Sequence, residues 1–183
     1  TDKAFRWYIS KLSISGLNFR VEHYIYKRLL SIDSNSLDIE RLILLEVCSI
    51  LALICNNLSF CYFQNSLNYD GFKYLFSQPE FDGHKMSIQT GKFLDSLRDW
   101  LNRYDEAESI KAFVGHEKDM DLPAISIIVA QFRFKSGMAR FGVIGPNRQH
   151  YDKVMAIIEY IINVIKEVSY GKKRQFRLET RRG

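Results

Sequence analysis

The stretch Gly142-Val-Ile-Gly-Pro-Asn-Arg-Gln-His-Tyr-Asp-Lys-Val154 decides the fold of this chain. Its apolar beginning is typical of a strand, and Gly145-Pro146 ends that strand because proline has no N–H to donate to a ladder. Asn147 follows at a position where its side-chain oxygen could cap a helix. The apolar stripe that starts at Tyr151 predicts this helix over residues 148–168. The stretch therefore predicts a corner between a strand and a helix.

Directly before this corner, residues 125–144 predict a β-hairpin. From Gln131 to Lys135, polar and aromatic side chains alternate, as they do on the two faces of a strand. Ser136-Gly137 is a turn pair that leads into a second strand at 138–144. Two further strands are expected, because 58–63 is rich in aromatic residues and 110–114 alternates. Strands joined in this way predict an antiparallel sheet.

Helical periodicity accounts for most of the remaining chain. It predicts helices at 5–12, 21–29, 37–56 and 93–104, with a single helical turn at 72–76. The helix over 37–56 is apolar almost all round, so we expect it to be central. The polar residues 64–71 are expected to form a flexible connection. The predicted fold is an α+β domain in which helices pack on one side of an antiparallel sheet, with an N-terminal helical segment.

The net charge of +5 is confined to one end of the chain. Residues 171–183 hold one acidic and six basic side chains, whereas residues 1–170 carry equal numbers of both signs. Only this tail is therefore expected to contact nucleic-acid phosphates, without sequence preference. The alternative is a solvated terminus without a partner. The candidate phosphate contacts are Lys172, Lys173, Arg174, Arg177, Arg181 and Arg182.

Composition disfavours several classes of protein. At 183 residues and 46% hydrophobic composition, the chain suits one compact domain. No secretion signal is recognised, and the longest apolar run, 42–55, is interrupted by Glu46 and is shorter than the about 20 residues that span a bilayer. Cys48, Cys55 and Cys61 show no CxxC spacing, so we expect buried, reduced thiols in a cytoplasmic protein. We expect no membrane partner, no metal site and no cofactor.

Enzyme signatures are incomplete in this sequence. Thr90-Gly91-Lys92 is similar to the end of a phosphate-binding loop, but Phe93 stands where such a loop needs a hydroxyl residue. The GxSxG motif of serine hydrolases is absent. His116-Glu117 has the residue types of a base and its orienting carboxylate, but a loop dipeptide of this kind is more often solvated. We therefore expect a protein without catalytic residues.

Arg148 and Tyr151 are the candidates for a binding role at the corner. An arginine beside the exposed amides of a helix start can hold an anion or an acidic partner. The structural alternative is that Arg148 bonds the backbone carbonyls of the corner while Tyr151 packs inward. The sequence leaves both interpretations open.

The corner closely resembles the segment GVIGPTRMDYxKV near the end of the HrcA family of bacterial heat-inducible transcription repressors. Four other blocks resemble this family in the same order. Thr1-Asp-Lys-Ala-Phe-Arg-Trp-Tyr-Ile9 is similar to TDKGYRFYVD, and Leu53-Ile-Cys-Asn-Asn57 resembles LSELTN more loosely. Asp70-Gly-Phe-Lys-Tyr-Leu-Phe-Ser-Gln-Pro-Glu-Phe81 resembles dGtxnLLxqPEF, and Phe113-Val-Gly-His-Glu117 resembles xIGxEN. The family-motif residues of the corner, which we expect to be structural, are Gly142, Gly145, Pro146, Arg148 and Tyr151.

This resemblance implies a GAF-like domain over residues 36–170. A helical linker segment, 1–35, would precede it and the basic tail, 171–183, would follow it. The chain would begin just after the family's winged-helix DNA-binding domain. A long segment with an inserted dimerising domain would be shortened between residues 63 and 70, either in the gene or by omission from the sequence.

The resemblance also implies a function. The chain would be the regulatory and dimerisation part of a cytoplasmic repressor that negatively controls chaperone operons. Such a repressor binds an inverted-repeat operator as a homodimer through its winged-helix domains, and the GroE chaperonin keeps it competent. The alternative is a GAF-like domain that senses a small molecule, for which the sequence singles out no pocket.

Overall fold

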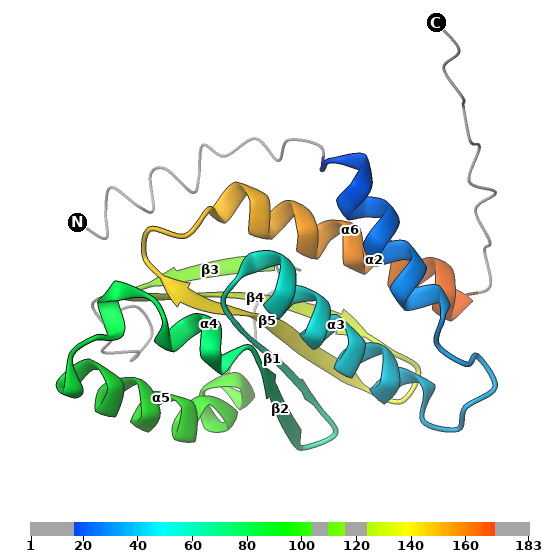
Figure 1. Cartoon of the computed structure of the whole chain (residues 1–183). Helices are drawn as coiled ribbons and strands as arrows, with labels where there is room; N and C mark the ends of the chain where they lie inside the picture. The colour runs from blue at the N-terminus through cyan, green and yellow to red at the C-terminus, as the bar shows by residue number, and fades with distance from the viewer. Residues whose placement is uncertain (1–16, 104–109, 116–123, 171–183) are drawn as a thin grey trace, which may run out of the picture.

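The computed structural model describes residues 17–103, 110–115 and 124–170. The strands of its sheet come from both halves of the chain (Figure 1). In chain order, the elements are α2 (Phe19–Leu30), α3 (Ile39–Cys55), β1 (Leu58–Phe63), β2 (Ser66–Asp70), α4 (Phe72–Phe76), the 3-10 helix η1 (Pro79–Phe81), α5 (His84–Asn102), β3 (Ile110–Val114), β4 (Ile125–Arg133), β5 (Met138–Pro146) and α6 (Tyr151–Tyr170).

The strands form one five-stranded antiparallel sheet in the order β2-β1-β5-β4-β3. Strand β5 is central, and its Gly142 lies opposite Phe60 of β1 and Val129 of β4. The predicted hairpin between β4 and β5 is present, and the Phe134 N–H donates to the Gly137 carbonyl oxygen at 2.9 Å across its turn. The predicted GAF-like α+β class with an antiparallel sheet is confirmed.

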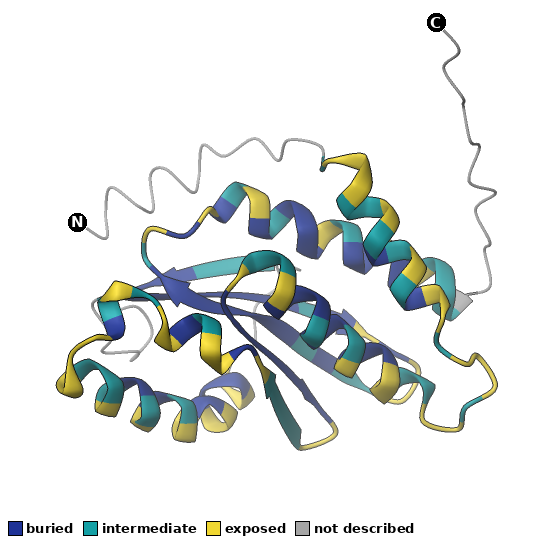
Figure 2. Ribbon diagram, in the orientation of Figure 1, coloured by how far each residue is buried: buried dark blue, intermediate teal, exposed yellow. Residues whose placement is uncertain are grey.

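Helices cover both faces of this sheet, so the expectation of helices on one side only is wrong. All six residues of β1 are buried, and successive side chains point to opposite faces. Cys61 and Phe63 pack in the core beneath α2, α3 and α6, whereas Phe60 and Tyr62 pack in the core beside α4 and α5 (Figures 1 and 2). Because each face is apolar, leaving either one in water would cost about 25 cal/mol per Å² of exposed surface.

The connection expected at 64–71 is instead a tight turn followed by an edge strand. Gln64 and Asn65 have φ angles of 47° and 63°. Positive φ at both central residues is the signature of a type I′ turn, whose twist matches that of the two strands it joins. The residues of β2 are half-exposed at the border of the sheet, apart from the exposed Asp70, which explains why this strand lacks a strong hydrophobic pattern.

The starts of α2 and α3 lie within two residues of the expected positions, whereas those of α5 and α6 lie further away. Helix α5 begins at His84 rather than near residue 93. The periodicity did not reveal this start, because the first turns of the helix bury little apolar surface. Helix α6 begins at Tyr151, because the preceding residues form a turn in which the Gln149 N–H donates to the Pro146 carbonyl oxygen at 2.9 Å. Asn147 therefore lies within this turn and not at the capping position of the helix.

Helix α3 is central, as its sequence predicts. Seven of its residues are buried, and it packs on β1, β5, α2 and α6. An ion pair between Arg28 of α2 and Glu46 of α3 joins the two helices, and Arg28 also donates to the Tyr24 hydroxyl at 2.6 Å. Across the described ranges, no helix is both long enough and apolar enough to cross a membrane. The helix predicted at 5–12 lies outside the described residues.

Candidate functional site

Two glycines of the corner are required by close packing. An added Cβ at Gly142 would lie 1.9 Å from the Ile128 carbonyl oxygen, which is backbone and cannot move aside. At Gly145 an added Cβ would lie 2.7 to 2.8 Å from the side-chain amide of Asn57. The strand end therefore approaches both β4 and the turn between α3 and β1 more closely than any other residue type would allow.

Gly145 makes room for a buried network of polar side chains. Asn57 Nδ2 donates to Gln149 Oε1 at 3.3 Å, and Gln149 Nε2 donates to Ser126 Oγ at 2.7 Å. Ser126 Oγ in turn donates to the Pro146 carbonyl oxygen at 3.3 Å. All three side chains are buried. Because buried polar groups are costly without partners, this network fixes the corner against α3 and β4.

Arg148 projects from the corner and binds η1. Its Nε lies 2.6 Å from Glu80 Oε1, its Nη2 lies 3.2 Å from Glu80 Oε2, and Nη2 also donates to Gln78 Oε1 at 2.9 Å. The guanidinium lowers the pKa of the Glu80 carboxyl, chiefly through the hydrogen bond between them. An acidic partner is therefore present within the chain itself, and these three contacts of the guanidinium are with side chains rather than with backbone carbonyls.

Tyr151 points inward at the start of α6. Its side chain is buried in the core shared by α2, α3 and α6, and its hydroxyl donates to the Asn147 carbonyl oxygen at 3.0 Å. The structure thus brings all five family-motif residues together in one corner. Gly142, Gly145 and Tyr151 are packed inside, Pro146 accepts two hydrogen bonds, and Arg148 alone is exposed.

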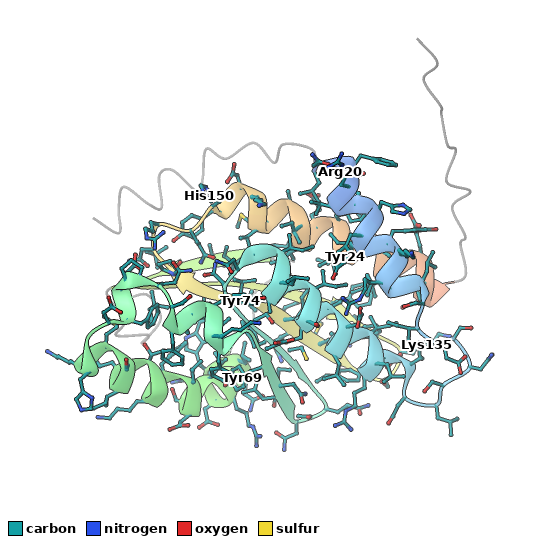
Figure 3. All side chains as sticks on the ribbon, in the orientation of Figure 1. Arg20, Tyr24, Tyr69, Tyr74, Lys135 and His150 are labelled. Atoms are coloured by element: carbon teal, nitrogen blue, oxygen red, sulfur yellow. The ribbon has the colours of Figure 1, made fainter. Side chains whose placement is uncertain are left out.

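A pocket of about 290 Å³ lies beside this network, between the end of α3 and the start of α6. Asn57 and Gln149 line it with amide groups, and Arg148, His150 and Lys153 contribute nitrogen donors. His150 and Lys153 are exposed at the beginning of α6, where His150 is visible in Figure 3. The pocket therefore offers hydrogen-bond donors and positive charge to a small polar or anionic molecule.

Cys55 also lines this pocket. Desolvation raises the pKa of its thiol to about 12, so the thiol is protonated at neutral pH and reacts slowly. Cys48 and Cys61 are buried, and all three cysteines are free. Among the described residues, no group of three or more His, Cys, Asp or Glu side chains is placed to hold a metal ion.

Sequence reasoning did not identify Glu80, Asn57 and Ser126 as parts of this corner. Glu80 stood in a block that resembles the family, but nothing local paired it with Arg148, 68 residues away. Asn57 and Gln149 are 92 residues apart, and no periodic pattern connects them. The dipeptide His116-Glu117 and the six basic residues of the tail lie outside the described residues. Thr90 and Gly91 lie within helix α5.

The family model described as "HrcA protein C terminal domain" matches residues 14–155. The similar curated proteins include the heat-inducible transcription repressor HrcA of Rhodopseudomonas palustris, 32% identical over 76 residues that make up 40% of this chain and 21% of the relative. The repressor of the same name from Geobacter sulfurreducens is 29% identical over 126 residues, covering 60% of this chain and 35% of the relative. The chain thus spans about a fifth to a third of the length of these relatives.

A solved structure with a similar fold is known. It is a crystal structure of a hypothetical protein at 2.2 Å resolution, with a TM-score of 0.59 and 12% sequence identity, and the match covers 94% of this chain and 80% of the other. At this identity, the likeness concerns the fold alone.

Proposed function

The chain belongs to the HrcA family of heat-inducible transcription repressors, and from this premise we propose that it is the regulatory and dimerisation part of such a repressor. In this proposal, the complete protein is a cytoplasmic homodimer that binds an inverted-repeat operator and negatively controls chaperone operons. A winged-helix domain outside this chain reads the operator. The GroE chaperonin acts as a partner that keeps the protein competent.

The observation that carries this proposal is the family match over residues 14–155, which extends from before α2 into α6. The contacts within the corner support a structural role for this domain. The polar groups of Asn57, Ser126 and Gln149 bind one another, and Arg148 binds Glu80. The relatives are named as transcription repressors, a class of proteins that is not enzymatic. We infer that this chain likewise acts without catalysis.

The proposed mechanism is that the body sets the distance between two DNA-binding domains. A palindromic operator must be matched by a protein with two-fold symmetry. Residues 36–170 would form the GAF-like body and residues 1–35 the link to the DNA-binding domain. Heat would act on the stability of this body, because natural domains are stable by only about 5–15 kcal/mol. Loss of the folded body would release the operator and expose apolar surface to the chaperonin.

The test is to heat the full-length repressor and to follow two quantities together. Circular dichroism would report the unfolding of the body, and electrophoretic mobility would report binding to the inverted repeat. We expect both transitions to coincide near the temperature of the heat-shock response. A body that stays folded well above that temperature while the operator is released would contradict the mechanism.

The basic tail, 171–183, is proposed to contact DNA phosphates. Each phosphate neutralised by a cation changes the slope of log K against log salt by about 0.9. Deleting the tail from the full-length repressor should therefore make operator binding less dependent on salt. An unchanged slope would remove this part of the proposal, while leaving the role of the body untouched.

A second candidate function, the sensing of a small molecule, is favoured by the pocket of about 290 Å³ beside α6. Thermal-shift titration with inorganic phosphate and with nucleotides tests it. We expect stabilisation of the wild type that is weaker in Lys153→Ala. Equal melting temperatures with and without each compound would leave scaffolding as the function of the domain.

A further inference from the structure

Strand β2 leaves one side of its backbone open at the border of the sheet. It pairs with β1 on its inner side, and within residues 17–103, 110–115 and 124–170 no strand pairs with its outer side. Figure 1 shows β2 as the border strand. Open edges of this kind are templates for pairing with another chain, and natural proteins protect them with lysine, proline, bulges or covering elements. The β2 sequence Ser66-Leu-Asn-Tyr-Asp70 contains neither lysine nor proline.

The register of the β1–β2 hairpin shows which backbone groups are open. The two-residue turn at Gln64 and Asn65 makes Phe63 and Ser66 a hydrogen-bonded pair. Pairs alternate along an antiparallel ladder, so Asn68 and Asp70 also direct their N–H and C=O groups toward β1. In agreement, Ser59 Oγ lies 3.4 Å from the Asp70 carbonyl oxygen. Leu67 and Tyr69 therefore direct their backbone N–H and C=O groups toward the open side.

Helix α3 covers one face of this edge, and aromatic side chains flank the other. On the first face α3 packs against β2, and Cys48 Sγ lies 4.0 Å from the Asn68 carbonyl oxygen. On the other face the Tyr69 and Phe72 rings lie 5.5 Å apart, and the Phe72 side chain is 42% exposed. An exposed aromatic side chain beside an open strand adds apolar surface that association with another chain would bury.

We propose that the β2 edge is the surface through which two copies of this chain associate, with their β2 strands paired antiparallel about a two-fold axis at Asn68. This proposal rests on the homodimer of the proposed function, but not on any DNA contact. One register satisfies every open backbone group of the edge: Leu67 pairs with the partner's Tyr69, and Tyr69 pairs with the partner's Leu67. The result is a continuous sheet across the two copies.

The charges of the strand favour a second copy as the occupant. The single charged residue of β2 is Asp70, at its end. In the proposed register, Asp70 lies opposite the partner's Ser66, so the two carboxylates stand at opposite ends of the paired strands. The two Asn68 side chains meet at the axis as a pair that is not hydrogen-bonded through the backbone, with Cα atoms about 4.5 Å apart. Because this contact joins the same residue of both copies, one charged substitution at Asn68 places two like charges side by side, which tests the register.

The experiment places charges at Asn68 in the full 183-residue chain. Asn68 is half-buried and hosts a polar side chain, so Asn68→Lys and Asn68→Asp are expected to fold. Each variant alone brings like charges together at the axis, which should weaken the homodimer by up to about fivefold in sedimentation equilibrium. Mixing the two variants should restore association, with the mixed dimer dominating in native mass spectrometry. The same two substitutions at Asn163, exposed on α6, are the matched control and should change nothing.

Thermal melts of each variant separate misfolding from loss of association. A wild-type chain that stays monomeric at high concentration would overturn the proposal. A dimer that neither Asn68 variant weakens would also overturn it, as would folded variants that both dissociate but do not recombine when mixed. Failure here leaves the repressor proposal intact, because operator binding by the full-length protein is measured separately. Conversely, a dimer that forms through β2 but whose full-length protein binds no operator would support the β2 interface and contradict the repressor proposal.

Discussion

The Arg148 guanidinium and the Glu80 carboxylate form a two-point ion pair, with Nε 2.6 Å from Oε1 and Nη2 3.2 Å from Oε2. This contact joins the β5–α6 corner to η1, so two separate sequence blocks that resemble the same family meet in space. The pair lies at the surface, and the Arg148 side chain remains 56% exposed. Its contribution to stability is therefore expected to be small and sensitive to pH and salt.

The pH dependence of this pair can be tested with Glu80→Gln. Because Arg148 lowers the pKa of Glu80 in the folded protein, the carboxyl stabilises the fold above its ordinary pKa of 4.5, and this contribution is lost as the pH falls through the folded value. We expect the variant to be less stable than the wild type near neutral pH, and the two to converge below pH 4.5. Urea unfolding over this range measures the difference. Asp82→Asn, an exposed acid beside η1, is the control and should not reproduce the convergence.

The close approach at Gly142 predicts a severe effect of a single methyl group. In Gly142→Ala the new Cβ would lie 1.9 Å from a backbone oxygen, so β4 and β5 must separate. We expect a loss of about 3 kcal/mol in the free energy of unfolding, at the upper end of overpacking effects. Gly91→Ala in α5 is the matched control, since nothing lies within 4 Å of the position that its new Cβ would take. That variant should be stabilised by about 0.5–1 kcal/mol.

The buried amide network predicts a penalty at Ser126. Ser126→Ala removes the 2.7 Å acceptor of Gln149 Nε2 and leaves a buried amide without that partner. The expected loss is about 1–3 kcal/mol, measured by denaturant unfolding. Ser96→Ala removes a hydroxyl from the exposed face of α5 and serves as the control. Equal stabilities of the two variants would show that the network does not hold the corner.

The raised pKa of the Tyr69 hydroxyl leads us to expect a loss of stability at high pH. Burial raises the pKa of its hydroxyl from 10 to about 12, and the hydroxyl donates to the Leu94 carbonyl oxygen at 2.8 Å. The folded protein therefore holds this proton more tightly than the unfolded chain does, and stability falls as the pH rises from 10 toward 12.

Tyr69→Phe should cost about 1 kcal/mol near neutral pH, because one hydrogen bond is lost. Above pH 10 the variant should lose less stability than the wild type, so the two unfolding curves should approach each other. Tyr74→Phe, on the adjacent α4, is the control for the loss of one tyrosine hydroxyl. A difference between Tyr69→Phe and wild type that stays constant with pH would contradict the assignment.

Local patterns predicted most elements, because the spacing of apolar side chains along the chain differs between a helix and a strand. The alternation from Gln131 to Lys135 predicted β4, and the apolar surface around 37–56 predicted a central α3. Strand β2 was missed because an edge strand is half-exposed and needs no strong apolar alternation. The start of α5 was missed because its first turns are mainly polar or exposed, so no apolar stripe marks them.

The sequence by itself determined the α+β class, the antiparallel hairpin, the corner at Gly145-Pro146 and the resemblance to one family. These features depend on residues that are near one another in the chain, where backbone preferences and side-chain periodicity act. Only the tertiary structure decided that helices cover both faces, that Arg148 binds Glu80 and that Asn57 reaches Gln149. Such contacts join residues far apart in the chain, and they form only when packing of the two cores brings those segments together.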